Sequence, residues 1–270
     1  MHDHWINPSD YTMDCFLLFD RWVLRMIFNE QYPYPGDYIT DMAKALSQYP
    51  YIDAFCRIKA PETIPFLNKT RSVPNSGWTD SEMRKAETAI LQALETSVVY
   101  AYPEVMETVN YIRDWNPVYL YELVSLEDKI VLDVGAGTGR LAFAAAKKAR
   151  RVYASEPCDQ LREYMRDRIH KEGITNIKVL DGIVTCLPYE DNTFDAVLSG
   201  HVIGDDYDRE IAELTRVTKN GGDLVICNGE DEFCRSAPNH ELVTRGFSWF
   251  SHKSINGGTV YNYRKQIIKD

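Results

Sequence analysis

The sequence of 270 residues lacks the features of several protein classes. No stretch approaches the about 18 uninterrupted apolar residues that a membrane-spanning helix needs. Residues 1–4 are mostly polar, and no basic region leads into an apolar run as in a secretion signal. The six cysteines are dispersed, with neither a CxxC pair nor the spacing of a zinc site, so no metal is expected. We therefore expect a cytoplasmic protein without membrane contact.

Positive charge is also scarce, because 40 acidic residues outnumber 30 lysines and arginines. The formal net charge is −10, and the isoelectric point is near 5.2. Nucleic-acid phosphates are bound by clustered basic side chains, so this composition disfavours a general nucleic-acid binder. With 44% hydrophobic residues, the chain can bury a substantial core. Small molecules or proteins are the expected partners.

The first part of the chain, residues 1–125, has helical patterns and no series of strands. Apolar residues recur at helical spacing over residues 11–30, and a second helix is predicted over 37–49. Prolines then divide the chain as far as Pro74 into short pieces. Thr79 followed by Glu82 has the spacing of a capping box and predicts a helix to about residue 99. Pro103 suits the first turn of another helix, which is expected to end near residue 115.

After residue 125, short apolar runs alternate with helical segments. Helices are predicted after the glycine loop that begins at residue 135 and over 159–172 and 206–217. The predicted strands are 130–134, 151–155, 177–180, 194–199 and 223–227. The runs 246–254 and 259–268 flank a glycine turn and predict a terminal antiparallel hairpin. This alternation predicts an α/β fold, with a mainly parallel, doubly wound sheet covered by helices on both faces.

Residues 131–139, VLDVGAGTG, place three glycines directly after a buried strand and before a helix. Glycines in such a turn let the backbone approach a ligand closely. A nicotinamide-dinucleotide fold needs glycine or alanine at position 140, and Arg140 therefore disfavours that class. Glycines at 135, 137 and 139, with Asp133 two residues before the first, resemble the first motif of class I S-adenosylmethionine methyltransferases.

Further segments carry the same resemblance. Glu156 follows the second strand, where a carboxylate can accept hydrogen bonds from both ribose hydroxyls of an adenosine. Asp181 and Gly182 follow the third strand, where the acid can accept a hydrogen bond from the adenine amino group. The segment LPYEDNTFDAVL at 187–198 and the NGG at 220–222 are also similar to the family. The alternatives are that Glu156 is an exposed acid at a helix start and that Asp181 belongs to an ordinary turn.

The resemblance covers residues 126–269 and implies a Rossmann-like seven-stranded sheet with S-adenosyl-L-methionine as cofactor. It divides the chain into a helical N-terminal region, 1–125, and a methyltransferase domain, 126–270. The overall pattern is similar to the broad group that contains the quinone-biosynthesis methyltransferases, so we expect methyl transfer to a small-molecule acceptor that the sequence does not identify. The residues expected to contact the cofactor are Asp133, Gly135, Ala136, Gly137, Gly139, Glu156, Pro157, Asp181, Gly182, Ile183 and Ser199.

The chemistry of methyl transfer asks little of the side chains. A methyl group on a positively charged sulfur is already electrophilic, so the enzyme mainly aligns the acceptor and, where needed, removes a proton. His201 follows the fourth strand at the edge where methyl and acceptor should meet, and it is the candidate catalytic base. The alternative is that His201 caps the next helix or packs near the methionyl tail. Asp205 and Asp206 stand where that helix should begin, which favours a capping role.

DNA is not an expected substrate. The Asn/Asp-Pro-Pro-Tyr motif of amino-directed DNA methyltransferases is missing after the fourth strand, and no Pro-Cys nucleophile of the cytosine-C5 type is present there. The aromatic-rich N-terminal region could form a lid with the acceptor pocket, or a homodimer contact. Two alternatives stay open: a nicotinamide-dependent oxidoreductase, and a methyltransferase-like interaction protein that binds the cofactor without turnover.

Overall fold

The computed structural model describes residues 5–75, 77–229, 235–255 and 257–269. The chain forms two compact units, Met1–Met106 and Glu107–Asp270. This division comes earlier than the boundary at residue 125 expected from the sequence, because Leu120 and Leu123 belong to the core of the sheet. In the described parts of the chain, no helix is both long enough and apolar enough to cross a membrane.

The first unit is built from helices in its described part. The predicted capping box opens α5, since Thr79 Oγ1 accepts the Glu82 N–H at 3.3 Å and the Glu82 carboxylate accepts the Thr79 N–H at 2.8 Å. Pro50 and Pro61 are the first residues of helical segments, where no backbone N–H is required. The elements are η1 (Pro8–Asp10), η2 (Met13–Leu18), α1 (Arg21–Ile27), α2 (Tyr38–Ser47), α3 (Pro50–Lys59), η3 (Pro61–Thr63), α4 (Ile64–Ser72), α5 (Asp80–Ala93), α6 (Glu95–Val98) and α7 (Pro103–Met106).

The prediction of one continuous helix over residues 11–30 is wrong. The structure has the 3₁₀ helix η2 and the α-helix α1, separated by Phe19 and Asp20 in extended conformation. The Met13 N–H donates to Oε1 of the buried Glu87 at 2.8 Å, a contact between residues 74 positions apart. Such a contact depends on the folded unit, and local periodicity does not reveal it.

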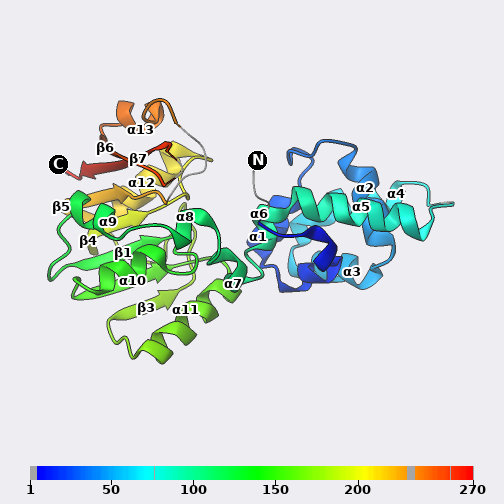
Figure 1. Ribbon diagram of the computed structural model, residues 1–270, viewed down its shortest axis with the longest axis horizontal. Coiled ribbons are helices and arrows are strands. Elements are labelled where there is room, and N and C mark those ends of the chain that lie inside the picture. The colour runs from blue at the N-terminus through cyan, green and yellow to red at the C-terminus, as the bar shows by residue number, and fades with distance from the viewer. Residues whose placement is uncertain (1–4, 76, 230–234, 256, 270) are drawn as a thin grey trace. The chain divides into compact units, whose positions relative to one another are not determined.

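The second unit contains a seven-stranded sheet in the order β3-β2-β1-β4-β5-β7-β6 (Figure 1). Strands β1 to β5 are parallel, and β7 runs antiparallel to both β5 and β6. The predicted doubly wound fold with a terminal antiparallel hairpin is therefore confirmed. The strands are β1 (Ile130–Val134), β2 (Arg151–Ser155), β3 (Ile177–Leu180), β4 (Phe194–Ser199), β5 (Thr218–Ile226), β6 (Ser248–Lys253) and β7 (Thr259–Gln266).

Helices cover both faces of this sheet. One core cluster holds side chains of α9, α10 and α11, and the other holds side chains of α12 and α13.

The single helix predicted over 103–115 is wrong, because α7 and α8 are separated at Val109, whose backbone is extended and whose side chain is buried. The helices are α8 (Asn110–Arg113), α9 (Val118–Leu123), α10 (Arg140–Ala146), α11 (Asp159–Glu172), α12 (Tyr207–Val217) and α13 (His240–Thr244).

The chain order reverses between β1 and β4, which are neighbours in the sheet although β2 and β3 come between them in sequence. In open parallel sheets, ligands bind at the carboxyl ends of the strands beside such a reversal. The glycine loop follows β1 directly, so the fold places it at this edge.

Candidate functional site

The glycine loop forms a tight turn between β1 and α10. Its three glycines have φ values of 63°, 59° and 96°, a left-handed region that favours glycine. The Gly139 N–H donates to the Ala136 carbonyl at 2.8 Å and closes the turn. The Ala136 N–H donates to the Ser155 carbonyl at 3.0 Å and joins the turn to β2. A Cβ at position 139 would lie 2.5 Å from the ring of Phe143, so only glycine fits there.

Glu156, directly after β2, hydrogen-bonds the backbone of this turn. Its Oε2 accepts the Gly137 N–H at 2.8 Å, and its Oε1 accepts the Cys158 N–H at 3.0 Å. The residue is only 3% exposed, so it is not the exposed helix-start acid of the alternative interpretation. Burial raises the pKa of its carboxyl, and the two backbone N–H groups oppose that shift. The Cys158 side chain also hydrogen-bonds this carboxylate. A carboxylate has about four acceptor positions, so one remains for a ligand hydroxyl.

Asp133 is the second buried carboxylate of the site and the penultimate residue of β1, two residues before the first glycine. It is 1% exposed, and burial raises its pKa to about 7, against the opposing positive charge of Arg140. Arg140, the first residue of α10, donates from Nη2 to the Cys227 carbonyl at 2.9 Å. Its guanidinium lies 4.6 Å from the centre of the Trp115 ring. Desolvation by burial lowers the pKa of Arg140.

Four buried polar atoms near the turn have no hydrogen-bond partner among the residues that the structure describes. Ser199 ends β4 and is paired in register with Val134, so it lies beside the end of β1. Buried donors and acceptors are rarely left unpaired, so a cluster of such atoms is typical of a position that binds a polar ligand. The atoms are Asp133 Oδ2, Thr138 Oγ1, Arg140 Nη1 and Ser199 Oγ.

The end of β3 lies at the same edge, because β3 pairs with β2 in parallel. The Asp181 side chain is 76% exposed and has one partner, Arg162 Nη1 at 3.4 Å. Gly182 is packed closely, since a Cβ there would lie 3.2 Å from Ser155 Oγ. Ile183 is half-buried and forms an isolated bridge with Cys186. Pro157 is also half-buried and precedes α11.

His201 has the unusual φ of 60°. Its Nε2 accepts the Gly229 N–H at 2.8 Å, and its ring lies 4.9 Å from that of Tyr111. Although the residue reaches solvent, desolvation by surrounding protein atoms and the charges of Arg140 and Arg235 lower its pKa to about 3. The imidazole is therefore neutral at physiological pH, and the nitrogen that a base would use already accepts a hydrogen bond.

The loop after β4 is held by a residue that the sequence analysis did not single out. Glu210 of α12 is 2% exposed, and its carboxylate accepts the N–H groups of Gly204, Asp205 and Asp206 at 2.9, 3.2 and 3.2 Å. Asp206 is the N-cap of α12, because its side chain accepts the Arg209 N–H at 3.2 Å. A glutamate in the first turn of a helix, whose carboxylate accepts N–H groups of the preceding loop, was not predicted from the sequence.

Comparison with known proteins agrees with this geometry. Residues 132–226 match a family model described as "Methyltransferase domain". The chain is 36% identical over 120 residues to a demethylmenaquinone methyltransferase of Thermobifida fusca, covering 43% of this chain and 50% of that protein. It is 28% identical over 158 residues to a demethylmenaquinone methyltransferase of Clavibacter sepedonicus, covering 58% and 61%. The chain thus spans about half to three fifths of the length of these relatives.

A solved structure shares the fold. The crystal structure of an S-adenosylmethionine-dependent methyltransferase from Aquifex aeolicus has a TM-score of 0.51 and 21% identity to this chain. The match covers 63% of this chain and 98% of that one. The glycine motif, the strand order and the match of residues 132–226 to the methyltransferase-domain model agree with one another, and the second unit is similar to class I S-adenosylmethionine-dependent methyltransferases.

Proposed function

We propose that this protein transfers the methyl group of S-adenosylmethionine to a small-molecule acceptor. The observation that carries the proposal is the set of unpartnered buried polar atoms around the glycine turn. The cofactor's methionyl end carries a carboxylate and an ammonium group, and its ribose carries two hydroxyls. A buried guanidinium, a buried carboxyl and two buried hydroxyls therefore fit a ligand of this polarity.

The cofactor supplies a methyl group on a positively charged sulfur, which needs no further activation. The residues of the chain would bind and orient the cofactor and the acceptor. Glu156 holds the glycine turn through Gly137 and keeps an acceptor position for a ribose hydroxyl. Asp181 is exposed at the neighbouring strand end and, beside its contact with Arg162, keeps acceptor positions for the adenine amino group. Arg140 and Asp133 place a guanidinium and a buried carboxyl next to the turn.

For His201 the geometry favours a positioning role over that of a catalytic base. Its Nε2 accepts the Gly229 N–H, which connects the end of β4 to the segment after β5. A general base needs a pKa near the working pH, whereas the pKa of this imidazole is lowered to about 3. We propose that His201 holds the loop beside the acceptor position.

We further propose that the acceptor is a quinone-type ring. Support comes from the two relatives that are named demethylmenaquinone methyltransferases. Since the chain spans only part of their length, the acceptor needs a direct test. Purified protein would be incubated with S-adenosylmethionine and a short-chain demethylmenaquinone, and the product would be examined by mass spectrometry for one added methyl group.

Cofactor choice is tested separately, by calorimetric titration with S-adenosylmethionine, S-adenosylhomocysteine and NADH. Binding of the two adenosyl-sulfur compounds without NADH is the expected result. Binding of NADH alone would favour the oxidoreductase alternative. Cofactor binding without methylation of quinone-type or other small acceptors would favour the interaction protein.

A further inference from the structure

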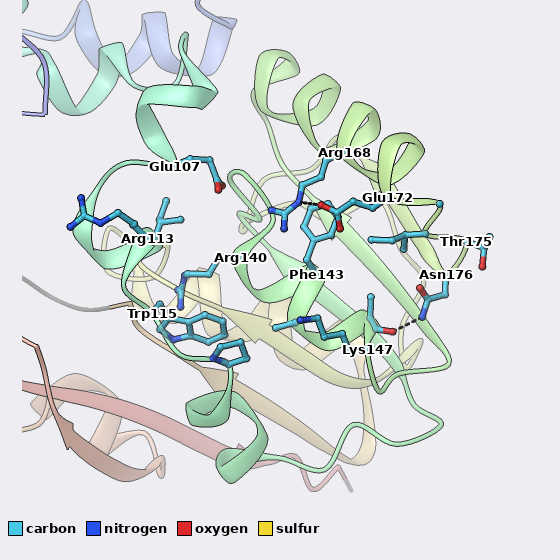
Figure 2. A pocket seen from close by; sticks show the side chains of 16 residues that line it. Glu107, Arg113, Trp115, Arg140, Phe143, Lys147, Arg168, Glu172, Thr175 and Asn176 are labelled. Carbon is cyan, nitrogen blue, oxygen red and sulfur yellow. Dashed lines mark hydrogen bonds and ion pairs between the residues drawn. The ribbon is translucent and has the colours of Figure 1, made fainter.

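The second unit has a cleft of about 760 Å³ beside α10 and α11. Its walls are α10, the end of α11 with the turn that follows, and the segment 107–117 (Figure 2). Of the residues that we assign to the cofactor site, Arg140 alone lines it. Ligand pockets in proteins typically have volumes of about 300–1,000 Å³. The cleft thus has the size of a small-molecule site, and it adjoins the cofactor site at Arg140.

Basic side chains dominate this cleft. Arg113, Arg140, Lys147 and Arg168 line it, against two acids, Glu107 and Glu172. The whole chain carries a formal charge of −10, so a basic cleft is a local exception. A concave site lined by charge of one sign concentrates ligands of the opposite sign.

Two of these basic groups are available to a ligand. Arg168 Nε donates to Glu172 Oε1 at 2.7 Å, and its guanidinium lies 4.0 Å from the centre of the Phe143 ring, where Figure 2 shows it. Its two terminal nitrogens make no hydrogen bond within the described residues. Lys147 is exposed and, unlike Arg168, has no ion-pair partner in the part of the chain that the structure describes.

The other two basic groups are already engaged. Arg113 donates to both carboxylate oxygens of Asp114, at 2.9 and 2.7 Å, and its guanidinium points away from the cleft in Figure 2. Arg140 is bound to the Cys227 carbonyl and lies over Trp115. The donors left for a ligand are therefore the two terminal nitrogens of Arg168, whose Nε is paired with Glu172, and the ammonium group of Lys147. Apolar Phe143 lies beside Arg168.

We propose that this cleft binds a phosphorylated small molecule, with Arg168 and Lys147 contacting the phosphate. An arginine held flat by an aromatic ring presents two parallel N–H groups that match phosphate oxygens, and lysine adds a point charge. The volume exceeds that of a bare phosphate, and the apolar side chains of Ile112 and Phe143 leave room for an organic part. Because α10 starts directly after the glycine turn, a ligand here touches the same helix as the cofactor.

The test uses the full chain saturated with S-adenosylhomocysteine, so that the cofactor site is filled. Pyrophosphate and phenyl phosphate are titrated by calorimetry into wild type, Lys147→Gln and Arg168→Gln. The control is Lys171→Gln, which removes the same charge from an exposed lysine near the end of α11 that does not line the cleft. We expect saturable binding that each cleft variant weakens about tenfold, the loss of one charged hydrogen bond. The control should stay within about twofold, because an exposed charge outside the cleft has a weak, screened effect.

Absence of saturable binding to wild type would overturn the proposal, as would equal weakening by Lys171→Gln. If Arg168→Gln lowers the melting temperature strongly, Lys147→Gln decides alone, because Lys147 is exposed and its change leaves the fold intact. Failure of S-adenosylhomocysteine itself to bind would contradict the proposed function instead; the phosphate titration of the unsaturated protein would then still test the cleft.

Discussion

Two buried carboxylates stand at the ends of neighbouring strands, and their environments differ. Glu156 accepts two backbone N–H groups, whereas Asp133 has one oxygen without a partner among the described residues. Hydrogen bonds to a carboxylate favour its charged form, and burial without them favours the neutral form. Changes at these two residues should therefore have different consequences.

Replacement of Glu156 should damage both stability and cofactor binding. Glu156→Ala leaves the N–H groups of Gly137 and Cys158 without their acceptor, and each unpaired buried group costs about 1–3 kcal/mol. We expect the free energy of unfolding to fall by roughly 2 kcal/mol or more, and affinity for S-adenosylhomocysteine to fall at least about tenfold. Urea unfolding and calorimetry measure both. Glu163→Ala, at an exposed position of α11, is the control, and equal losses there would contradict the role of Glu156.

Asp133 should make stability depend on pH. Its pKa is raised to about 7 in the folded protein, whereas an unfolded aspartate titrates near about 3.9. The folded state holds the proton more tightly, so this group's contribution to stability is full below pH ~4 and is lost as pH rises to about 7. We expect wild type to lose stability relative to Asp133→Asn between pH 4.5 and 8, measured by urea unfolding. A difference that does not change with pH would contradict the raised pKa.

Two substitutions of His201 distinguish a catalytic base from a positioning residue. His201→Gln keeps an acceptor for the Gly229 N–H but no group that titrates. We expect turnover to stay within about tenfold of wild type, since loss of a general base typically costs 10²–10⁴-fold. His201→Ala should lose more than His201→Gln, because it removes the acceptor. Equal losses of a hundredfold or more in both variants would restore the base hypothesis.

At the scale of elements, the start of α12 depends on Glu210, a buried glutamate in the first turn of that helix. Glu210→Ala leaves three loop N–H groups without their acceptor and should cost about 3 kcal/mol or more. Asp206→Ala removes an N-cap and should cost about 1 kcal/mol. Asp205→Ala should change stability by less than about 0.5 kcal/mol, because Asp205 contributes its backbone N–H. Urea unfolding of the three variants measures these losses in the free energy of unfolding. A loss for Asp205→Ala larger than that for Glu210→Ala would contradict the prediction.

At the scale of the whole molecule, the position of the domain boundary can be tested by truncation. A chain of residues 107–270 keeps the side chains of Trp115, Leu120 and Leu123 in the core of the sheet, and one of residues 126–270 loses them. Loss of a single buried leucine side chain costs about 2–5 kcal/mol. We expect the longer piece to unfold cooperatively and to bind S-adenosylhomocysteine, and the shorter piece to be unfolded. Equal melting temperatures would contradict the role of α9.

The lid role of the N-terminal unit remains a proposal, and the same truncation addresses it. If residues 1–106 cover the acceptor, the piece 107–270 should keep cofactor affinity and lose turnover. Full turnover by that piece would favour the dimer contact, which size-exclusion chromatography of the full chain would then examine.

Much of the candidate site could be predicted from the sequence because its signals are local. The glycines at 135, 137 and 139 must follow a strand directly, and Glu156 and Asp181 end the next two strands. Strands that follow one another in sequence usually lie side by side in a sheet, which favours β1, β2 and β3 as neighbours. Glu210 and Arg140 could not be assigned a role, since their partners, Gly204 and Cys227, are brought to them by the fold.

The sequence by itself determined the class of fold and the class of cofactor, because alternation of strands with helices and the spacing of glycines are properties of short segments. Tertiary structure alone decided that Glu156 is buried under the turn and that His201 is neutral. It also brought Arg168 and Lys147, from two different helices, to one cleft. The physical reason is that burial, and therefore charge state and hydrogen bonding, depends on contacts between residues far apart in the chain.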